Sequence, residues 1–388
     1  MPATEVRETE RASGDLSEHA IAAILEDRIE SGIYEPGSRL PSERDLALEF
    51  GVSRRFVRMA SALLIERGLM EKSHYRRPFV ALENDRKRDT ASIDPGIAAT
   101  SANQTIAAVL PSHPAFPGGL SMVAGIHKVL AYSGSPCRLT FIDTFHKDRP
   151  EVLRIETNAI RSLTQSGVSG LIWWSYSDDD QIAATIRANP GVPIVFIDRH
   201  PSDRDCDFVG IDDVESSRMA VEHLIDLGHT RIAHLMDPGN YSTILARAEG
   251  WRQAHAAREI PCTDDMIFHL GWSEDRVQLA FDHWYSLPDP PTALFTSNDF
   301  IAHEFINYAE TRGIRVPDDL SVIGHGNIDR YSPREFLTSV DQPFEQIGKA
   351  AARLMLKRLA QGEATQSYQQ IIMPATLIER SSCRALRG

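Results

Sequence analysis

Basic side chains cluster in two short segments near the amino terminus, and their type suits recognition of a nucleic acid. These segments contribute one serine and five arginines: Ser53, Arg54, Arg55, Arg58, Arg76 and Arg77. The planar guanidinium group of arginine matches both phosphate oxygens and the O6 and N7 atoms of guanine. The two segments therefore predict hydrogen bonds to the bases and the backbone of DNA.

The residues around the first segment have the periodicity of a helix-turn-helix. A first amphipathic helix is expected from Ser17 to near Gly32, because apolar residues recur there at three- and four-residue steps. A second helix over residues 43–50 and a third that starts after Ser53 are separated only by a turn at Gly51. In such a motif the first turn of the later helix faces the major groove, which places the arginines against DNA.

A basic turn between two short strands is expected over residues 69–82, and it would form a wing that contacts the DNA backbone or the minor groove. A solvated helical cap with ordinary surface arginines is the alternative. The helix cap, the turn, the arginine cluster and the wing all agree with DNA binding, so they favour it.

The sequence PGSRLPSERDLALEFGVSRRFVRMASALLIERGL resembles the winged-helix domain of GntR-type transcription regulators. The resemblance implies operator contacts from four arginines: Arg44, Arg54, Arg55 and Arg58. The sequence departs from the family pattern at Phe56, where threonine is common, and at the wing tip, which has no glycine.

Residues 83–104 carry charge, proline, glycine and small polar side chains without apolar periodicity, which predicts a linker. From residue 105 onward, short apolar strands alternate with amphipathic helices in two similar halves, the pattern of parallel α/β sheets. We therefore expect a winged helix-turn-helix domain over residues 16–82 and an α/β module over residues 105–388.

Polar residues directly follow the predicted strands, where open parallel sheets bind their ligands. They are Ser112, His113, Asp198, Arg199, Asp237, Asn298 and Asp299. Three aromatic residues would be available for stacking: Phe116, Trp251 and Trp272. Each polar residue taken alone could be a helix cap, but the whole set predicts a cleft for a small ligand rich in hydroxyl groups.

Motifs such as ARAEGW, PPTALFTSNDFIA and GIRVPDDLSVIGHGN resemble the effector-binding and dimerisation module of the LacI/GalR regulators, which has the fold of periplasmic sugar-binding proteins. The resemblance implies effector contacts from Asp198, Arg247 and Asn298, and weaker ones from Trp272 and Gln342. After the SVIG motif the chain has His325, Gly326 and Asn327 in place of an aromatic residue and two aspartates, so a carboxylate common in relatives is missing.

The same resemblance implies two subdomains and a homodimer. The N-subdomain would comprise about 105–209 and 342–368, and the C-subdomain about 210–341 and 369–383. The dimer contacts would come from residues 122–132 and 343–359. The hybrid arrangement is similar to that of arabinose-responsive regulators, and it implies a repressor of a double-stranded operator under the control of a sugar or sugar derivative.

Composition agrees with this expectation. Of the net charge of −13, −11 lies in residues 91–388. Residues 16–90 carry equal numbers of acidic and basic side chains, so a local basic surface remains there. No apolar run is long enough for a signal peptide or a membrane span, which predicts a cytoplasmic protein. The 4 cysteines are scattered without a CxxC pair and predict neither a zinc site nor a disulfide.

Two other functions are considered. An enzyme is one, because α/β sheets host many enzymes and the chain has several histidines: His223, His229, His234, His303 and His325. No HExxH, GxSxG or P-loop motif occurs, so we expect hydrogen-bonded or surface histidines, with no catalysis, metal or cofactor. A metal- or acid-sensing GntR regulator with an all-helical effector domain is the other, and the strand-like runs GLIWW and PIVFID oppose it.

Overall fold

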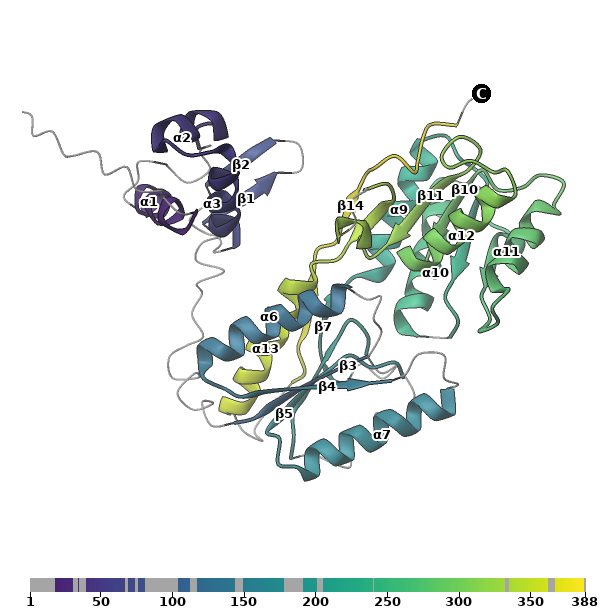
Figure 1. The fold of residues 1–388 in the computed structure, drawn as a ribbon. Helices are drawn as coiled ribbons and strands as arrows, with labels where there is room; N and C mark the ends of the chain where they lie inside the picture. The colour runs from purple at the N-terminus through teal and green to yellow at the C-terminus, as the bar shows by residue number, and fades with distance from the viewer. Residues whose placement is uncertain are drawn as a thin grey trace, which may run out of the picture. The chain divides into compact units, whose positions relative to one another are not determined.

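The computed structural model divides the chain into two units, residues 1–93 and residues 94–388, and each is described by itself. The residues that it describes are 18–30, 34, 40–66, 69–73, 76–80, 104–111, 117–143, 149–177, 191–200, 205–239, 241–331, 335–361 and 367–386. The predicted linker lies outside these residues except for Gln104. Figure 1 shows the helices and strands of both units.

The first unit is a winged helix-turn-helix, as predicted. Its elements are α1 (Glu18–Glu30), α2 (Glu43–Phe50), α3 (Arg54–Glu66), β1 (Met70–Ser73) and β2 (Arg76–Val80). The two strands pair antiparallel, with Met70 opposite Val80. Buried Leu25, Leu46 and Leu64 bring the three helices into one core. Burial of these apolar faces stabilises the short helices, which would be marginal alone.

The boundaries of α2 are set by its capping residues. Ser42 Oγ accepts a hydrogen bond from the Asp45 backbone N–H at 3.2 Å and donates to the Asp45 carboxylate at 2.6 Å. Gly51 ends the helix with φ 66°, a left-handed conformation that glycine adopts without strain. This turn brings α3 back across α2, so the cap and the glycine determine where the arginines of α3 point.

The second unit is an α/β module with two sheets of six strands in its described part. The first sheet, in spatial order, comprises β13 (Gln370–Met373), β7 (Asp207–Ile211), β6 (Ile194–Ile197), β5 (Gly170–Trp173), β3 (Ile106–Pro111) and β4 (Cys137–Ile142). The second comprises β14 (Thr376–Ile378), β12 (Thr338–Asp341), β11 (Ser321–His325), β10 (Ala293–Thr296), β8 (Ile232–Met236) and β9 (Ile267–His269). All neighbouring strands are parallel except β12 and β14.

Helices cover both sheets. They are α6 (Pro117–Ser133), α7 (Arg149–Gln165), α9 (Asp213–Asp226), α10 (Ser242–Ala257), α11 (Arg276–Tyr285), α12 (Asp299–Thr311) and α13 (Phe344–Gln361). In Figure 1, α7 lies on one face of the first sheet and α6 with α13 on the other. Both strands and helices occur throughout, so the alternative of an all-helical effector domain is wrong. Among the described residues, no helix has the length and apolar character needed to cross a membrane.

The chain passes between the sheets after β7, β12 and β13. The predicted subdomain division differs from the structure at two of these points. Strand β7 continues to Ile211, and residues 370–373 belong to the first sheet, although 369–383 was assigned to the C-subdomain. The physical reason is the free edge of β7: Gln370 pairs with Phe208 and Met373 with Ile211 before the chain returns to the second sheet as β14.

Helices α6 and α13 approach each other through glycines. A Cβ atom on Gly125 would lie 2.1 Å from the backbone oxygen of Glu345, and one on Gly348 would lie 2.2 Å from that of Met122. These distances are far below van der Waals contact, so the two backbones touch where a side chain would separate them. The packing of α6 on α13 therefore depends on both glycines.

Gly125→Ala and Gly348→Ala are expected to lower the free energy of unfolding by roughly 1–3 kcal/mol each, the usual range for overpacking. The sign is informative, because alanine in an unobstructed helix is more stable than glycine by about 1 kcal/mol. Urea unfolding followed by circular dichroism measures the change. Gly271→Ala is the control, since nothing lies within 4 Å of the added atom. Unchanged or raised stability in both helix variants would contradict the close packing.

Candidate functional site

The predicted DNA-contacting residues of the first unit lie on its helix-turn-helix. Arg44 on α2, Ser53 at the start of α3, and Arg54, Arg55 and Arg58 on its first turns are all exposed. Arg76 and Arg77 form the start of β2, for which the structure describes the backbone only. The structure thus gathers the five described residues on α2, on α3 and in the turn between them.

One of these arginines is engaged within the protein. Arg58 donates to both carboxylate oxygens of Glu43, at 3.2 and 2.9 Å, and thereby joins α3 to α2. Its guanidinium lowers the pKa of the Glu43 carboxyl through these hydrogen bonds. The pair is exposed, so its contribution to stability is small. It fixes the direction of Arg58 and leaves Arg54 and Arg55 as the arginines better suited to base contacts.

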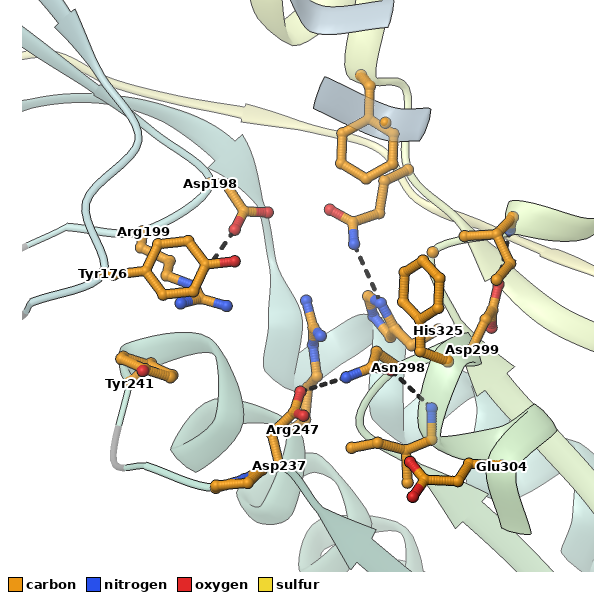
Figure 2. A pocket seen from close by; sticks show the side chains of 18 of the residues that line it. Tyr176, Asp198, Arg199, Asp237, Tyr241, Arg247, Asn298, Asp299, Glu304 and His325 are labelled. Atoms are coloured by element: carbon orange, nitrogen blue, oxygen red, sulfur yellow. Dashed lines mark hydrogen bonds and ion pairs between the residues drawn. The ribbon is translucent and has the colours of Figure 1, made fainter. Parts of the chain in front are cut away.

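A cavity of about 310 Å³ lies in the α/β module. It is lined by residues from both subdomains, several of which follow the carboxyl ends of strands (Figure 2). The polar groups in its wall are Tyr176, Asp198, Arg199, Asp237, Tyr241, Arg247, Arg276, Asn298, Asp299, Glu304, His325 and Gln342. Five residues predicted to contact an effector line it together: Asp198, Arg247, Trp272, Asn298 and Gln342. Ser112 and Phe116 lie outside the described residues.

Arg247 is held by a buried ion pair that the sequence did not indicate. Its Nε and Nη2 atoms lie 2.8 and 2.7 Å from one carboxylate oxygen of Asp213, and Nη1 donates to the Ser297 carbonyl at 2.6 Å. Burial raises the pKa of Asp213 to about 6, although Arg247 opposes the shift. Most of the donor capacity of Arg247 is therefore used inside the protein, and its orientation is fixed.

His325, at the end of β11, continues this network. Its Nε2 atom lies 3.1 Å from Ser216 Oγ, and its Nδ1 atom accepts from the Gln342 amide at 3.2 Å. Burial, with nearby Arg247, holds the pKa of His325 well below its ordinary value, so the ring is neutral. Ser216 Oγ in turn donates to the Asp213 carbonyl at 3.2 Å. The imidazole thus has the hydrogen-bonded structural role expected for the histidines.

Asn298 is both a helix cap and a cavity residue. Its side-chain oxygen accepts from the Ile301 backbone N–H at 3.0 Å at the start of α12, and its amide donates to the Asp237 carboxylate. Burial raises the pKa of Asp237. The cap holds the amide group of Asn298 in place, so its second N–H is available to a molecule in the cavity.

Arg199 lies in a corner formed by two aromatic rings. Its guanidinium carbon is 4.3 Å from the ring centre of Tyr176 and 4.2 Å from that of Tyr241. The rings meet edge to face, with centres 5.5 Å apart. Asp198 precedes Arg199 with φ 64°, a conformation that aspartate tolerates better than most residues. Its carboxylate lies 3.5 Å from Arg199 Nε.

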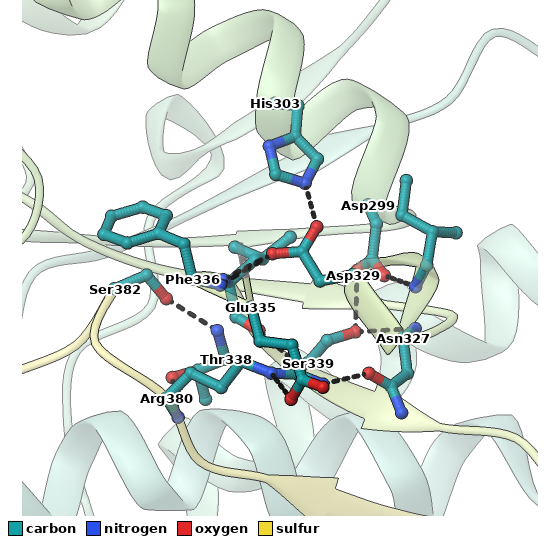
Figure 3. Close-up of polar contacts among 12 residues, drawn as sticks. Asp299, His303, Asn327, Asp329, Glu335, Phe336, Thr338, Ser339, Arg380 and Ser382 are labelled. Atoms are coloured by element: carbon teal, nitrogen blue, oxygen red, sulfur yellow. Dashed lines mark hydrogen bonds and ion pairs between the residues drawn. The ribbon is translucent and has the colours of Figure 1, made fainter. Parts of the chain in front are cut away.

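A second network holds the turn after β11 (Figure 3). The two oxygens of buried Asp299 accept from Ser339 Oγ at 2.6 Å and from the Ile328 backbone N–H at 2.7 Å. Asp329 accepts from the backbone of Phe336 at 3.0 Å and contacts His303 at 2.7 Å. Burial raises the pKa of Asp299 to about 6. This wall of the cavity is therefore fixed by hydrogen bonds on both sides of the turn.

Sequence reasoning erred at one aromatic residue and missed others. Trp251 was expected to stack on a ligand, but it is 0% exposed and its indole donates to the Ile232 carbonyl in the core. Tyr176 and Tyr241 line the cavity but were not predicted. Tyr176 lies three residues beyond the end of β5, so the rule that selected residues directly after strands did not reach it.

Glu156 is buried behind Tyr176 and fixes its backbone. Its carboxyl accepts from the Tyr176 backbone N–H at 2.7 Å and from the Trp173 indole at 3.3 Å. Ser175 Oγ lies 3.1 Å from the other carboxyl oxygen and 2.5 Å from the Ser177 carbonyl. The Ser175 hydroxyl has one proton to donate, and the shorter contact is with the Ser177 carbonyl. The contact between Ser175 and Glu156 is then explained by a protonated Glu156 carboxyl that donates to Ser175 Oγ. Burial raises the pKa of Glu156 to about 7, in agreement with this arrangement.

The stability of the module is therefore expected to depend on pH through Glu156. The folded state keeps a proton that the unfolded state loses above its ordinary pKa of 4.5, so the free energy of unfolding falls as pH rises from about 4.5 to about 7. The difference is on the order of 3 kcal/mol. Glu156→Gln should remove this component, measured by urea unfolding between pH 5 and 8, whereas Glu151→Gln on the same helix should behave as wild type. Parallel pH profiles for wild type and Glu156→Gln would show that Glu156 is ionised.

Two comparisons of sequence agree with the two units. Residues 17–80 match the bacterial regulatory proteins of the gntR family, and residues 221–383 match the periplasmic binding protein-like domain. The HTH-type transcriptional repressor PurR of Aliivibrio salmonicida is 30% identical over 203 residues, which are 52% of this chain and 60% of the repressor. The chain thus spans about 60% of the length of this relative.

Solved structures of transcription regulators share the fold of the module. The regulator CcpA of Lactococcus lactis has a TM-score of 0.63 at 20% identity, and the match covers 73% of this chain and 100% of CcpA. A LacI family regulator from Enterococcus faecium with bound ribose has a TM-score of 0.60 at 25% identity, with 73% and 100% covered. These relatives are transcription regulators and not enzymes. The chain combines a winged helix-turn-helix that matches the gntR family with a module that matches the periplasmic binding protein-like domain and has the fold of these regulators.

Proposed function

We propose that the protein is a cytoplasmic transcriptional repressor whose affinity for a double-stranded DNA operator is set by a small ligand in the cavity of the α/β module. The observation that carries the proposal is that one chain joins exposed arginines on a helix-turn-helix to a cavity lined by both subdomains of a LacI-type module. The first supplies donors for DNA, and the second supplies a site whose occupation can change the module.

The ligand is a sugar or sugar derivative. Planar polar side chains such as Asp237 and Asn298 pair well with hydroxyl groups. Trp272 lines the cavity and is 43% exposed, and an aromatic ring suits the apolar face of a sugar. The Enterococcus faecium relative that holds ribose supports the same class of ligand.

The ligand acts by closing the two subdomains on each other. A ligand shifts an equilibrium only by its differential affinity for the two states, so it must contact both sides. Asp198 and Arg199 follow a strand of the first sheet, whereas Asp237 and Asn298 follow strands of the second. Closure therefore changes the number of contacts that the ligand makes.

The functional form is a homodimer that reads a roughly palindromic operator. A single winged helix presents too few base contacts for tight specific binding, and two copies double them. The module provides the dimer contact through α6 and α13. Leu120 and Tyr132 on α6 are 70% and 76% exposed, which suits a surface that a second copy covers.

Arg54→Ala and Arg55→Ala are expected to lower operator affinity by about 5- to 150-fold if each contacts a base, because one bidentate base contact contributes about 1–3 kcal/mol of discrimination. Duplexes selected from random DNA by the full chain serve as operator, and fluorescence anisotropy at fixed salt gives Kd. Affinity for an unselected duplex should fall much less.

The control for these variants is Arg161→Ala. It removes the same charge from an exposed position on α7 of the module and should leave both affinities unchanged. Circular dichroism verifies that each variant is folded. Wild-type operator affinity in both helix variants would refute the assignment of α3 as the recognition helix.

A further inference from the structure

We propose that the ligand of the cavity carries an anionic group, a carboxylate or a phosphate, which Arg199 binds in the corner formed by Tyr176 and Tyr241. The inference rests on the proposed function, since it names the chemical class of the ligand of that same cavity. Figure 2 shows the three side chains beside one another at one side of the cavity.

Two guanidinium nitrogens of Arg199 make no hydrogen bond in the described part of the protein. Its Nε and Nη1 atoms are buried without any hydrogen-bond partner in the described structure. Asp198 compensates part of the charge at 3.5 Å from Nε, but this contact is too long for a hydrogen bond. Buried donors without acceptors are costly, and a charged donor is the costliest. The arrangement is therefore one that a bound acceptor completes.

The other arginines of the cavity are already paired. Arg247 is bound to Asp213 and to the Ser297 carbonyl. Arg276 donates to the carboxylate of Glu304 at 2.7 Å. Among the described residues, Arg199 is thus the one cavity arginine with guanidinium nitrogens that are buried without a hydrogen-bond partner. An anionic group on the ligand is consequently expected beside Arg199, and not beside Arg247.

Four carboxyl groups line the cavity, and they leave room for an anion. Asp198 lies beside Nε of Arg199, whereas Nη1 has no partner among the described residues. Glu304 is neutralised by Arg276, and Asp299 accepts hydrogen bonds at both oxygens. Burial raises the pKa of Asp237, and that of Asp299 to about 6, so both protonate more readily than surface carboxyls when a negative charge approaches.

The two tyrosines favour the same assignment. They hold the guanidinium by cation–π contacts from two directions, so little side-chain entropy is lost when a ligand binds it. Tyr176 follows β5 of the first sheet, and Tyr241 precedes α10 of the second subdomain. An anion at Arg199 therefore lies where the two subdomains meet and stabilises their closed arrangement.

The remainder of the ligand is polar and uncharged. The amide oxygen of Gln342 is buried without a partner and can accept from a hydroxyl group. The second amide N–H of Asn298 can donate to another. A sugar acid or a sugar phosphate fits this distribution of donors and acceptors, with the anion at one end and hydroxyl groups at the other.

Calorimetric titration of the full chain with matched sugars tests the proposal. Three sets are used, each with a neutral sugar, its carboxylate and its phosphate ester: ribose, ribonate and ribose 5-phosphate; glucose, glucuronate and glucose 6-phosphate; galactose, galacturonate and galactose 1-phosphate. In at least one set, an anionic member is expected to bind at least about tenfold more tightly than the neutral sugar, as charge-assisted hydrogen bonds imply. Whether the carboxylate or the phosphate binds identifies the anion.

Arg199→Gln should abolish the preference for the anion, and Arg199→Lys, which keeps the charge without the planar fork, should restore part of it. Arg218→Gln is the matched control, because Arg218 pairs with Glu215 and Glu222 on α9 and does not line the cavity. Operator binding without ligand shows that each variant is folded and should be unchanged in all three.

Failure of the anion site and failure of the proposed function give different results. If a neutral sugar binds as tightly as its anionic counterparts, the anion site is wrong and the proposed function stands. The same conclusion follows if Arg199→Gln weakens binding of the neutral and the anionic sugar equally. If no member of any set binds, the cavity is not a sugar site, and the proposed function fails together with the inference.

Discussion

The buried ion pair between Arg247 and Asp213 connects the cavity to the segments that join the two subdomains. Asp213 begins α9, which the chain enters directly from β7 of the first sheet, whereas Arg247 lies on α10 of the second subdomain. Through Ser216 and His325 the network reaches Gln342, where the chain returns from β12 toward α13. Removal of one partner would leave a charge buried and unpaired. The pair thus holds two of the crossovers and one wall of the cavity in a single arrangement.

Arg199 differs from Arg247, because two of its guanidinium nitrogens are buried without an acceptor among the described residues. Arg247 is surrounded by acceptors and orients the wall, whereas Arg199 is held by aromatic rings and retains buried donors without acceptors. Arg247 thus has a structural role, whereas the role that we propose for Arg199 is ligand binding. Asp198, which precedes Arg199, has a left-handed backbone conformation. Such strain persists only where the surrounding structure imposes it.

The sequence predicts the positions of the cavity residues through one rule: carboxyl ends of parallel strands meet at one edge of a sheet. That rule, with the resemblance, placed Asp198, Arg247 and Asn298 together. The rule does not show which donors of the cavity arginines are paired within the protein. Asp212 and Asp213 are adjacent in the sequence, and only tertiary packing determines that Asp212 caps α9 whereas Asp213 pairs with Arg247. Trp251 was misassigned because an aromatic residue on a helix suits both a core and a binding site. Residues 370–373 were misassigned because edge pairing to β7 has no local signal.

The central claim is that the cavity and the operator-binding surface are coupled, and ligand titration with and without operator measures this most directly. By linkage, the factor by which operator changes the Kd of the ligand equals the factor by which ligand changes the Kd of the operator. Coupling predicts a common factor of about 5- to 150-fold, the usual range for allosteric proteins. The same ligand Kd in the presence and absence of saturating operator would contradict the claim.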